Sequence, residues 1–329
     1  MNNKFPQIRL RRLRQNSTIR NMLAAPLPPP EKFVWPTFVV EGYGIKQPIS
    51  SMPGQFRYSI DTLLEAVGKL ITTGVKSVML FGVVSHKDKS CDAAYAMRDD
   101  GIVQCAIRAL KKKYPELLLF TDVCVCEYTA HGHCGIIDNT GAVLNDPSLE
   151  LLAQMALSHA RAGADVVAPS AMMDGQIQAI RTALDANKFT ETILMSYSTK
   201  FSSSMYGPFR EAADSAPNVG DRKTYQADFR NLNSALRESE LDEAEGADIL
   251  MVKPAMLYLD LITRIKQQTK LPLAAYNVSG EYAMLIATAD RGWGDLKMMV
   301  RESIFAMDRA GVDIFISYWA NQYKKMIND

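Results

Sequence analysis

Apolar residues recur along the chain in short runs that each follow a glycine and one or two polar residues. This phrase occurs at 74–82 (GVKSVMLFG), 163–172 (GADVVAPSAM), 246–256 (GADILMVKPAM) and 311–320 (GVDIFISYWA). Such a glycine is typical of the end of a helix, and the apolar run after it is typical of a buried strand. The pattern therefore predicts helices that lead directly into strands covered on both faces.

Extended over the whole chain, this pattern predicts eight strands separated by helices. The strands are expected near residues 33–42, 77–84, 117–126, 166–170, 192–200, 247–253, 271–279 and 313–319. The helices are expected near residues 59–73, 99–113, 147–162, 174–187, 224–245, 256–269, 281–289 and 296–310. Strict alternation indicates parallel pairing, and eight such units in roughly 250 residues or more predict a (β/α)8 TIM barrel. A doubly wound open sheet is the alternative, and it is disfavoured because no G-x-G-x-x-G follows the first strand.

Two segments fall outside the repeating units. Residues 1–32 end in PLPPP and are expected to form an extended N-terminal arm for subunit contacts, whereas residues 33–329 are expected to form the catalytic barrel. Residues 201–223 make a long polar stretch with scattered glycine and proline. A loop of this length inside a compact domain is typical of an active-site lid, with a disordered segment as the alternative.

Composition and charge narrow the classes of protein that fit this architecture. The chain has 329 residues, of which 47% are hydrophobic and 22% charged, and its formal net charge is +1. A charge so close to zero argues against a nucleic-acid partner, and no apolar run reaches the roughly 18 residues of a membrane span. The five cysteines fit a reducing compartment, so we expect a cytoplasmic protein. The Arg-rich, acid-poor start of the chain leaves a transit peptide as an open alternative.

Two lysines stand where predicted strands end, which is where a TIM barrel carries its reactive groups. Lys200 ends the fifth strand, and Lys253 ends the sixth in the run ILMVK. Burial and a neighbouring cation can lower the pKa of a lysine from roughly 10.4 by about 3 to 5 pH units. A neutral amine attacks carbonyl groups, so the pair predicts Schiff-base chemistry. An ion pair or a snorkelling side chain would be the simpler interpretation of one lysine alone.

Three cysteines, Cys124, Cys126 and Cys134, leave the third strand in the spacing C-x-C-x7-C. Three thiolates are a soft donor set for zinc, and three protein ligands leave a fourth position open for chemistry. His131 and His133 lie in the same loop and could replace or support a ligand. Small core cysteines are the alternative interpretation. A period of two places Cys124 and Cys126 on one face of the expected strand, which favours the metal site.

The expected lid carries two arginines, Arg210 after YGPF and Arg222 in GDRKTYQ. Guanidinium groups bind carboxylates through paired N–H donors. A single arginine on an exposed loop is more often only solvated. Above a barrel mouth with two lysines and three cysteines, however, the two arginines favour capture of a substrate carboxylate.

Several long motifs together resemble one known family. They are DVCVCEYTAHGHCG (122–135), YSTKFSSSMYGPFREA (197–212), GDRKTYQ (220–226), LMVKPAMLYLD (250–260) and AAYNVSGEYAM (274–284). In this order they resemble the porphobilinogen synthase family, also called 5-aminolaevulinate dehydratase, of the zinc-dependent kind. The likeness runs from about residue 8 to the C-terminus.

The resemblance implies that the chain joins two molecules of 5-aminolaevulinate into porphobilinogen, with loss of two waters, in tetrapyrrole (haem) biosynthesis. By the family pattern, Lys253 forms a Schiff base with the substrate that becomes the propionate side, and Lys200 forms a second one. The pattern also implies Ser279 and Tyr318 for the first carboxylate, Arg210, Arg222 and Gln226 for the second, Asp122 and Ser170 as pocket lining, and Tyr206 and Phe209 in the lid.

The same resemblance implies cofactors and partners. Cys124, Cys126 and Cys134 would bind a catalytic zinc ion, and Glu238 sits where many family members bind a second, activating (allosteric) magnesium ion. Family members assemble as homo-octamers through an N-terminal arm, which fits residues 1–32. The expected partners are thus the small-molecule substrate and further copies of the chain, with no nucleic acid and no membrane.

Three short segments depart from the family pattern, and two other functions compete. The departures are MLAAPLPPPEK (22–32), TYQADFRNLN (224–233) and Glu127, and they concern, in this order, the arm, a subunit or effector contact, and the affinity for zinc.

A class I aldolase would need one lysine and no metal, so the paired lysines and the three cysteines disfavour it. A non-catalytic zinc-binding barrel is disfavoured because all five of these residues are present.

Overall fold

The structure is a computed structural model that describes residues 4–218 and 220–328. Eight parallel strands form a closed barrel, and their bounds are β1 (Phe33–Val40), β4 (Ser77–Val83), β5 (Leu118–Val123), β6 (Val166–Pro169), β7 (Ile193–Lys200), β8 (Ile249–Lys253), β9 (Leu273–Asn277) and β10 (Ile314–Ser317). β10 pairs with β1, with Phe315 opposite Phe33, so the barrel has no open edge. The predicted TIM barrel is confirmed.

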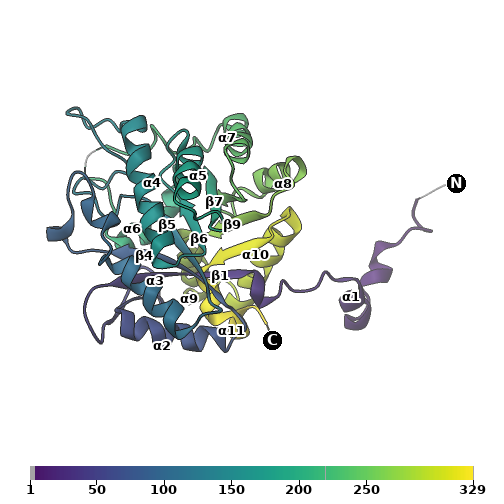
Figure 1. The fold of residues 1–329 in the computed structure, drawn as a ribbon. Helices are drawn as coiled ribbons and strands as arrows, with labels where there is room; N and C mark the ends of the chain where they lie inside the picture. Colours follow the sequence, from purple (N-terminus) through teal and green to yellow (C-terminus); the bar gives the residue numbers. More distant parts are fainter. Residues whose placement is uncertain (1–3, 219, 329) are drawn as a thin grey trace.

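Helices cover the outside of the barrel (Figure 1). Their bounds are α2 (Ile60–Ile71), α3 (Ile102–Lys113), α4 (Asn145–Ala162), α5 (Gln176–Ala186), α7 (Leu232–Ala244), α8 (Leu259–Gln268), α9 (Ser279–Asp290), α10 (Leu296–Ala310) and α11 (Tyr323–Met326). α4 and α10 end at Gly163 and Gly311, whose φ angles of 106° and 107° are favourable only for glycine. The glycine of the repeated phrase therefore ends the helix, and the chain enters the next strand.

The barrel interior is filled by side chains. β8 is buried at all five positions and β6 at all four, as expected for strands covered on both faces. Tyr197, Tyr276 and Tyr318 are fully buried rings that follow one another, with centroid distances of 6.5 and 6.1 Å. Each such side chain contributes about 1.5–3 kcal/mol through burial. The core therefore holds the strand ends, and the polar groups on them, in fixed positions.

The strand expected near 117–126 is too long, because β5 ends at Val123. Cys124 and Cys126 lie instead in the turn that follows, so the argument from a shared strand face is wrong. The amides of Tyr128 and Thr129 both donate to the carbonyl of Val125, which closes a turn in place of strand pairing.

The helix expected from residue 224 begins only at Leu232. The side chain of Asn231 accepts a hydrogen bond from the Ser234 amide at 3.1 Å, a helix N-cap that defines the start of α7. A hairpin of β2 (Lys46–Pro48) and β3 (Phe56–Tyr58) was not predicted, and β3 pairs with β1. Both strands have only three residues, too few for a pattern of alternation.

The expected lid at 201–223 is partly helical. It contains a short 3-10 turn, η5 (Ser204–Tyr206), followed by helix α6 (Gly207–Ala213), with Pro208 in the first turn. Residue 219 of this segment, residues 1–3 of the expected arm and residue 329 of the barrel lie outside the described residues. No helix within the described ranges combines the length and apolar character that a membrane crossing requires.

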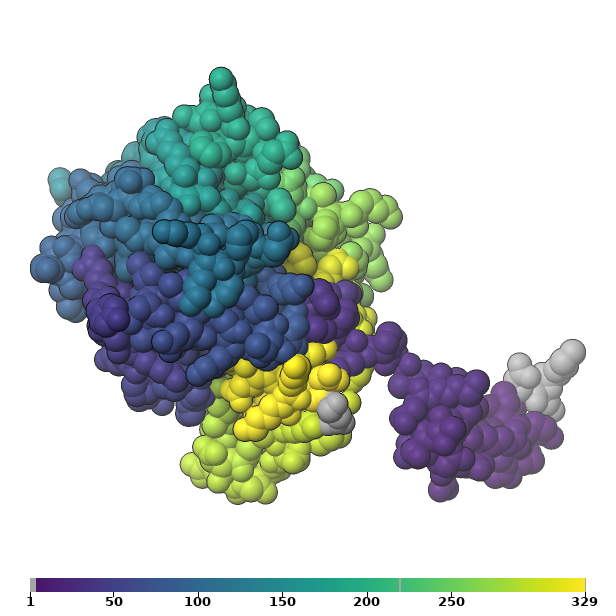
Figure 2. Space-filling view, turned by 60° about the horizontal axis from the view of Figure 1, so that its bottom comes forward, coloured from purple at the N-terminus to yellow at the C-terminus, as the bar shows by residue number. Residues whose placement is uncertain are grey.

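The arm stands away from the barrel, as Figures 1 and 2 show in purple. It is not fully extended, because it contains η1 (Leu10–Arg14), α1 (Ser17–Leu23) and η2 (Pro30–Lys32). The side chain of Asn16 caps α1 by accepting a hydrogen bond from Ile19 N at 3.0 Å. Several large apolar side chains of the arm are exposed, including Phe5, Leu10 and Met22.

Candidate active site at the barrel mouth

The two predicted reactive lysines end adjacent strands. Lys200 is the last residue of β7, Lys253 is the last residue of β8, and the strand register places them opposite each other. Both are buried, with exposed fractions of 5% and 4%. Neither forms an ion pair with a carboxylate among the described residues. A buried amine without such a partner is a candidate for chemistry.

The amine of Lys253 lies in a cage of aromatic rings. Its Nζ is 4.2 Å from the ring centroid of Tyr276, 5.1 Å from those of Tyr197 and Phe209, and 5.4 Å from that of Tyr206. Burial, and then the positive charge of Lys200, lowers the pKa of Lys253 from 10.5 to about 7. Roughly half of this amine is therefore neutral near pH 7, the form that attacks a carbonyl.

Lys200 has a different environment. Its Nζ donates to the carbonyl oxygen of Ser170 at 2.6 Å and lies 5.7 Å from the ring centroid of Tyr197. Burial acts to lower the pKa of Lys200, but the nearby negative charges together, that of Cys134 first, outweigh it and raise the pKa. With no metal ion on the cysteines, the direction for Lys200 is thus opposite to the expected lowering. A divalent cation bound to the three cysteines would cancel the negative charge that raises the pKa of Lys200.

The three cysteines of the C-x-C-x7-C motif meet in space. The Sγ atoms of Cys124, Cys126 and Cys134 all lie within 4.8 Å of one another, and all three side chains are buried. Hydrogen bonds from the other two thiols lower the pKa of Cys134, whereas burial raises that of Cys124. The three sulfur atoms, one thiolate and two thiols that donate to it, form a donor set for zinc. A zinc ion would displace the two thiol protons and bind all three sulfurs. The residues present therefore fit a zinc ion.

Oxygen ligands lie beside the thiols, and the histidines are arranged differently from what the loop suggested. One donor atom each of Asp122, Cys124 and Glu127 also lies within 4.8 Å of the others, and Glu127 Oε2 is 3.2 Å from Cys126 Sγ. His131 and His133 belong to neither group of donor atoms. His131 Nδ1 accepts the amide of His133 at 3.1 Å, so this ring orders the loop that carries Cys134.

The lid brings further predicted residues over the lysines. The hydroxyl of Tyr206 donates to the carbonyl of Lys253 at 3.1 Å. The ring of Phe209 packs against Phe81 and Phe38 at centroid distances of 5.1 and 5.8 Å, which inserts the lid into the barrel mouth. These contacts cover the Lys253 side of the site.

The other lid residues carry buried polar atoms without partners. These atoms are Nε of Arg210, Nε of Arg222 and both side-chain polar atoms of Gln226. The Nη2 of Arg222 donates to the carbonyls of Gly132, at 2.9 Å, and of Ser215. Buried polar groups are nearly always hydrogen-bonded, so such a cluster indicates the binding place of a polar ligand.

Ser279, Tyr318 and Asp122 are the remaining predicted residues near the lysines. Ser279 Oγ accepts the amide of Phe209 at 2.9 Å, and the Tyr318 hydroxyl lies 3.2 Å from that of Tyr276. Asp122 is 6% exposed, its Oδ1 has no partner, and burial raises its pKa. The structure thus gathers the predicted residues at one end of the barrel.

Glu281 is a buried acid that anchors the turn after Lys253. Its Oε1 accepts the amide of Met256 at 2.7 Å, and its Oε2 accepts the amide of Val278 at 2.9 Å and Nδ2 of Asn277 at 3.0 Å. Burial raises the pKa of Glu281 to about 7. The carboxylate ties the end of β8 to the end of β9.

Glu238 lies apart from these groups, on α7. It lines a cavity of about 330 Å³ together with Asp174 and Gln226. Burial, and then the charges of Asp174 and Glu245, raises the pKa of Glu238. A bound cation would relieve the repulsion among these carboxylates.

Five residues that shape the site were not predicted. Tyr197 and Tyr276 cage the lysine, but they lie in strands buried on both faces, where no alternation marks a particular side chain. Arg57 and Lys89 hold the lid from the missed hairpin and from the loop after β4. Glu281 could have been found, because an acid in the first turn of a helix is a recognisable signal.

Comparisons with known proteins agree on one family. A family profile described as "Delta-aminolevulinic acid dehydratase" matches residues 7–326. The chain is 50% identical over 319 residues to the delta-aminolevulinic acid dehydratase of Synechococcus elongatus, covering 96% of this chain and 97% of the relative. It is 48% identical over 321 residues to that of Halalkalibacterium halodurans, covering 98% and 97%.

A solved structure supports the same assignment. The delta-aminolevulinic acid dehydratase (porphobilinogen synthase) of Toxoplasma gondii, solved with the reaction product porphobilinogen, matches with a TM-score of 0.94 and 44% identity. The match covers 97% of this chain and 91% of that one. From its sequence, its barrel and these relatives, the chain belongs to the delta-aminolevulinic acid dehydratase, or porphobilinogen synthase, family.

Proposed function

We propose how this chain carries out the reaction of its family, which joins two molecules of 5-aminolaevulinate into porphobilinogen and releases two waters. The observation that carries the proposal is the pair of buried lysines, in register at the ends of β7 and β8. Lys253 is the first nucleophile, because its neutral amine is well populated near pH 7. Its nitrogen adds to the substrate ketone, and loss of water gives the Schiff base.

Lys200 is proposed to form the second Schiff base, with the other substrate molecule. Its contact with the Ser170 carbonyl aims the amine into the same pocket as Lys253. Asp122 lies beside both lysines, and its Oδ1 has no hydrogen-bond partner. This oxygen can accept a proton when a substrate amine replaces a lysine amine at the Schiff-base carbon. Both lysines are released when the pyrrole forms, so the protein returns to its starting state.

The two substrate carboxylates are proposed to bind on opposite sides of the pocket. Ser279 and Tyr318 have hydroxyl groups on the Lys253 side, and the Ser279 hydroxyl, which donates to the Met205 carbonyl at 3.3 Å, would turn to the carboxylate. Arg210, Arg222 and Gln226 offer unpartnered donors on the lid side. An arginine pair suits a carboxylate because guanidinium N–H groups match its two oxygens. Tyr206 and Phe209 exclude water from Lys253, which keeps its ammonium form unfavourable.

We propose zinc and magnesium as cofactors. Cys124, Cys126 and Cys134 would hold the zinc ion, which when bound supplies Lewis acidity that favours the unprotonated amine of the second substrate. Glu238, beside Asp174, would take part in holding an activating magnesium ion in the cavity that both line with Gln226. Three thiols that must stay reduced suit the cytoplasm, which we propose as the location.

We also propose that the arm, residues 1–32, joins copies of the chain into a homo-octamer. Its exposed apolar side chains, among them Phe5, Leu10 and Met22, have no cover from the barrel of the same chain. Burial against another copy would remove this apolar surface from water. Sedimentation of the full chain beside a chain that begins at residue 30 tests this assignment.

Reductive trapping tests the catalytic assignment. We expect incubation with 5-aminolaevulinate and borohydride to leave a stable adduct on Lys253, located by peptide mass spectrometry. Lys253→Arg should remove that adduct, because guanidinium stays protonated and cannot add to a ketone. A folded protein without any lysine adduct would contradict the mechanism and favour a non-catalytic zinc-binding barrel. A colour assay for porphobilinogen distinguishes the reaction from that of a class I aldolase.

A further inference from the structure

The lid helix α6 ends in a strained turn. Asp214 follows the helix with a φ of 49°, a left-handed conformation that is uncommon for residues other than glycine. The last carbonyls of a helix have no partner within the helix and need donors from elsewhere. Such a turn persists only where surrounding contacts hold it. The end of α6 is therefore a place where the lid depends on the rest of the molecule.

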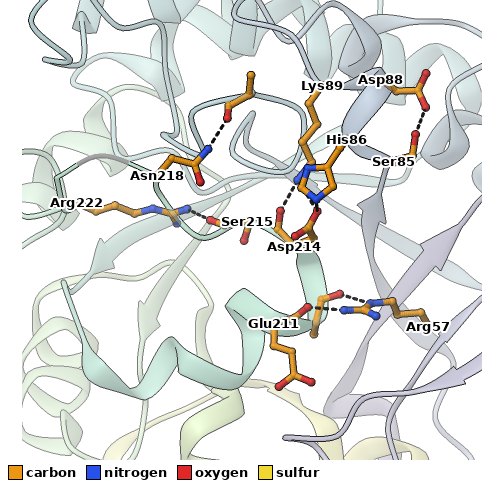
Figure 3. A network of polar contacts seen from close by, with 12 residues as sticks. Arg57, Ser85, His86, Asp88, Lys89, Glu211, Asp214, Ser215, Asn218 and Arg222 are labelled. Atoms are coloured by element: carbon orange, nitrogen blue, oxygen red, sulfur yellow. Dashed lines mark hydrogen bonds and ion pairs between the residues drawn. The ribbon is translucent and has the colours of Figure 1, made fainter.

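Two cations from other parts of the barrel supply these contacts (Figure 3). Arg57, on β3, donates from Nε to the carbonyl of Ala212 at 2.7 Å and from Nη2 to the carbonyl of Glu211. Lys89, in the loop after β4, donates from Nζ to the Asp214 carbonyl at 2.5 Å and to its carboxylate at 2.8 Å. The Lys89 side chain is only 7% exposed and that of Asp214 is 44% exposed, so this ion pair is shielded from water on the Lys89 side.

A third group at this turn is less constrained. His86 Nε2 lies 3.4 Å from the same Asp214 carboxylate, but its side chain is 86% exposed. An exposed ion pair contributes little, because water and salt screen it. Ser50 also donates to the Glu211 carboxylate, so Arg57 and Lys89 are the two buried or partly buried cations, rather than the sole residues, that hold the end of α6.

The clamped turn lies between the two lid arginines. Arg210 is on α6, and its carbonyl accepts the Ser215 amide at 3.2 Å. The Ser215 carbonyl in turn accepts Nη2 of Arg222, as Figure 3 shows. A shift at Asp214 would thus move both guanidinium groups through one short stretch of backbone.

The lid holds two like charges close together. Burial, and then the nearby charge of Arg222, lowers the pKa of Arg210. Two cations that approach in a low-dielectric site repel each other, so the closed lid needs an attraction elsewhere. The contacts of Arg57 and Lys89 with the end of α6 are such an attraction.

We infer that Arg57 and Lys89 are positioning residues of the reaction, a clamp that holds the lid closed and aligns Arg210 and Arg222 for the carboxylate of the second substrate. Neither clamp residue is assigned contact with substrate. The inference rests on the proposed function in one respect, the carboxylate-binding role of the two arginines.

A clamp of this kind has a distinct kinetic signature. If only a fraction of the free protein has its lid closed, the apparent affinity for substrate falls by that fraction. Saturating substrate pulls the lid shut again, so kcat changes much less than KM. Loss of one shielded, charge-assisted contact is expected to raise KM about 10-fold and to change kcat by less than about 2-fold.

The experiment compares three variants of the full chain with zinc bound. Lys89→Gln removes the charge of the clamp, Lys89→Arg keeps it, and Lys87→Gln is the matched control, because Lys87 is exposed two residues away. We expect a raised KM in Lys89→Gln, most of it recovered in Lys89→Arg, and wild-type values in Lys87→Gln. An unchanged KM in Lys89→Gln, or an equal fall of kcat in all three variants, would overturn the inference.

Hydrogen exchange of the free protein separates this inference from the proposed function. Amides of 207–218 should exchange faster in Lys89→Gln than in Lys87→Gln, while amides of β7 and β8 should stay equally protected in both. This readout does not depend on turnover. A wild-type protein that makes no porphobilinogen would defeat the proposed function, whereas equal exchange of 207–218 in both variants would defeat the clamp.

Discussion

The rim of the barrel and the lid above it position reactive groups by different means. Lys200 and Lys253 sit on neighbouring strands, and the parallel pairing of β7 with β8 determines their separation. Arg210 and Arg222 sit on a segment whose place depends on side-chain contacts, namely those of Arg57, Lys89 and Phe209. The first arrangement is rigid because a packed barrel resists deformation, and the second can open because a few contacts hold it.

This difference matches the two tasks. Bond formation requires amines held within a fraction of an ångström, which a strand end provides. Entry of two substrate molecules requires an opening, which a clamped lid provides. Changes at the rim should therefore reduce kcat, whereas changes at the lid should mainly raise KM.

The largest effect is expected from Lys253→Arg at the rim. We expect kcat to fall by more than about 10³-fold, because the guanidinium keeps the positive charge but cannot act as a nucleophile. Lys270→Arg is the control, since Lys270 is exposed. The porphobilinogen assay measures the change, and circular dichroism checks the fold. Substantial turnover by Lys253→Arg would refute the role of this lysine.

Removal of the metal should come next. Chelation is expected to abolish activity and added zinc to restore it, with Cys126→Ser needing about 10-fold or more zinc for half-maximal activity because hydroxyl is a poor zinc ligand. Cys105→Ser, which alters a cysteine on α3, should behave as the wild type. If activity survives complete chelation, verified by metal analysis, the proposed role of zinc in the reaction is wrong.

The rate of Schiff-base formation should depend on pH through Lys253. Its pKa of about 7 lies below the ordinary value of 10.5, so the neutral amine is lost as pH falls through 7. We expect the initial rate of borohydride trapping to fall about tenfold per pH unit below 7 and to level off above it. The same shift makes folding more stable as pH rises from about 7 to 10.5, because the unfolded chain still binds the proton there. A trapping midpoint near 10 would contradict burial and the charge of Lys200 as the cause.

A smaller effect at the rim is expected from Glu281→Gln. The new amide would face the backbone N–H groups that the carboxylate now accepts, at a cost of about 1–3 kcal/mol in the free energy of unfolding. Because the turn after Lys253 loses its anchor, kcat should fall by about 10-fold with little change in KM. Glu65→Gln, at an exposed position on α2, is the control. Urea unfolding and steady-state kinetics together check the result. A change in KM with an unchanged kcat would contradict the expectation that rim residues act on kcat.

Much of the rim was predictable from the sequence. The glycine phrase, found four times, and the apolar runs elsewhere predicted eight strands alternating with helices, and these local patterns are enough to place Lys200 and Lys253 at strand ends. Closely spaced cysteines also indicated a metal site, even though the strand expected to carry them ends earlier, at Val123. A short spacing keeps thiols within reach whether the backbone is a strand or a turn.

The lid was only partly predictable. Its length and polarity indicated a cover for the site, but helix α6 and its partners Arg57 and Lys89 were missed. Those partners are more than a hundred residues away in the chain, and no period in the sequence connects residues so far apart.

By itself, then, the sequence determined the order of elements, the strand ends that carry the lysines and the set of thiols, because these follow from local patterns of apolar residues and from spacing. The tertiary structure alone decided the opposite pKa directions of Lys253 and Lys200, since Lys253 is buried beside the cation of Lys200, whereas Lys200 lies beside the negative charge of Cys134. It also decided how the lid is held. Charge interactions and burial act through space, so they depend on which segments the fold brings together.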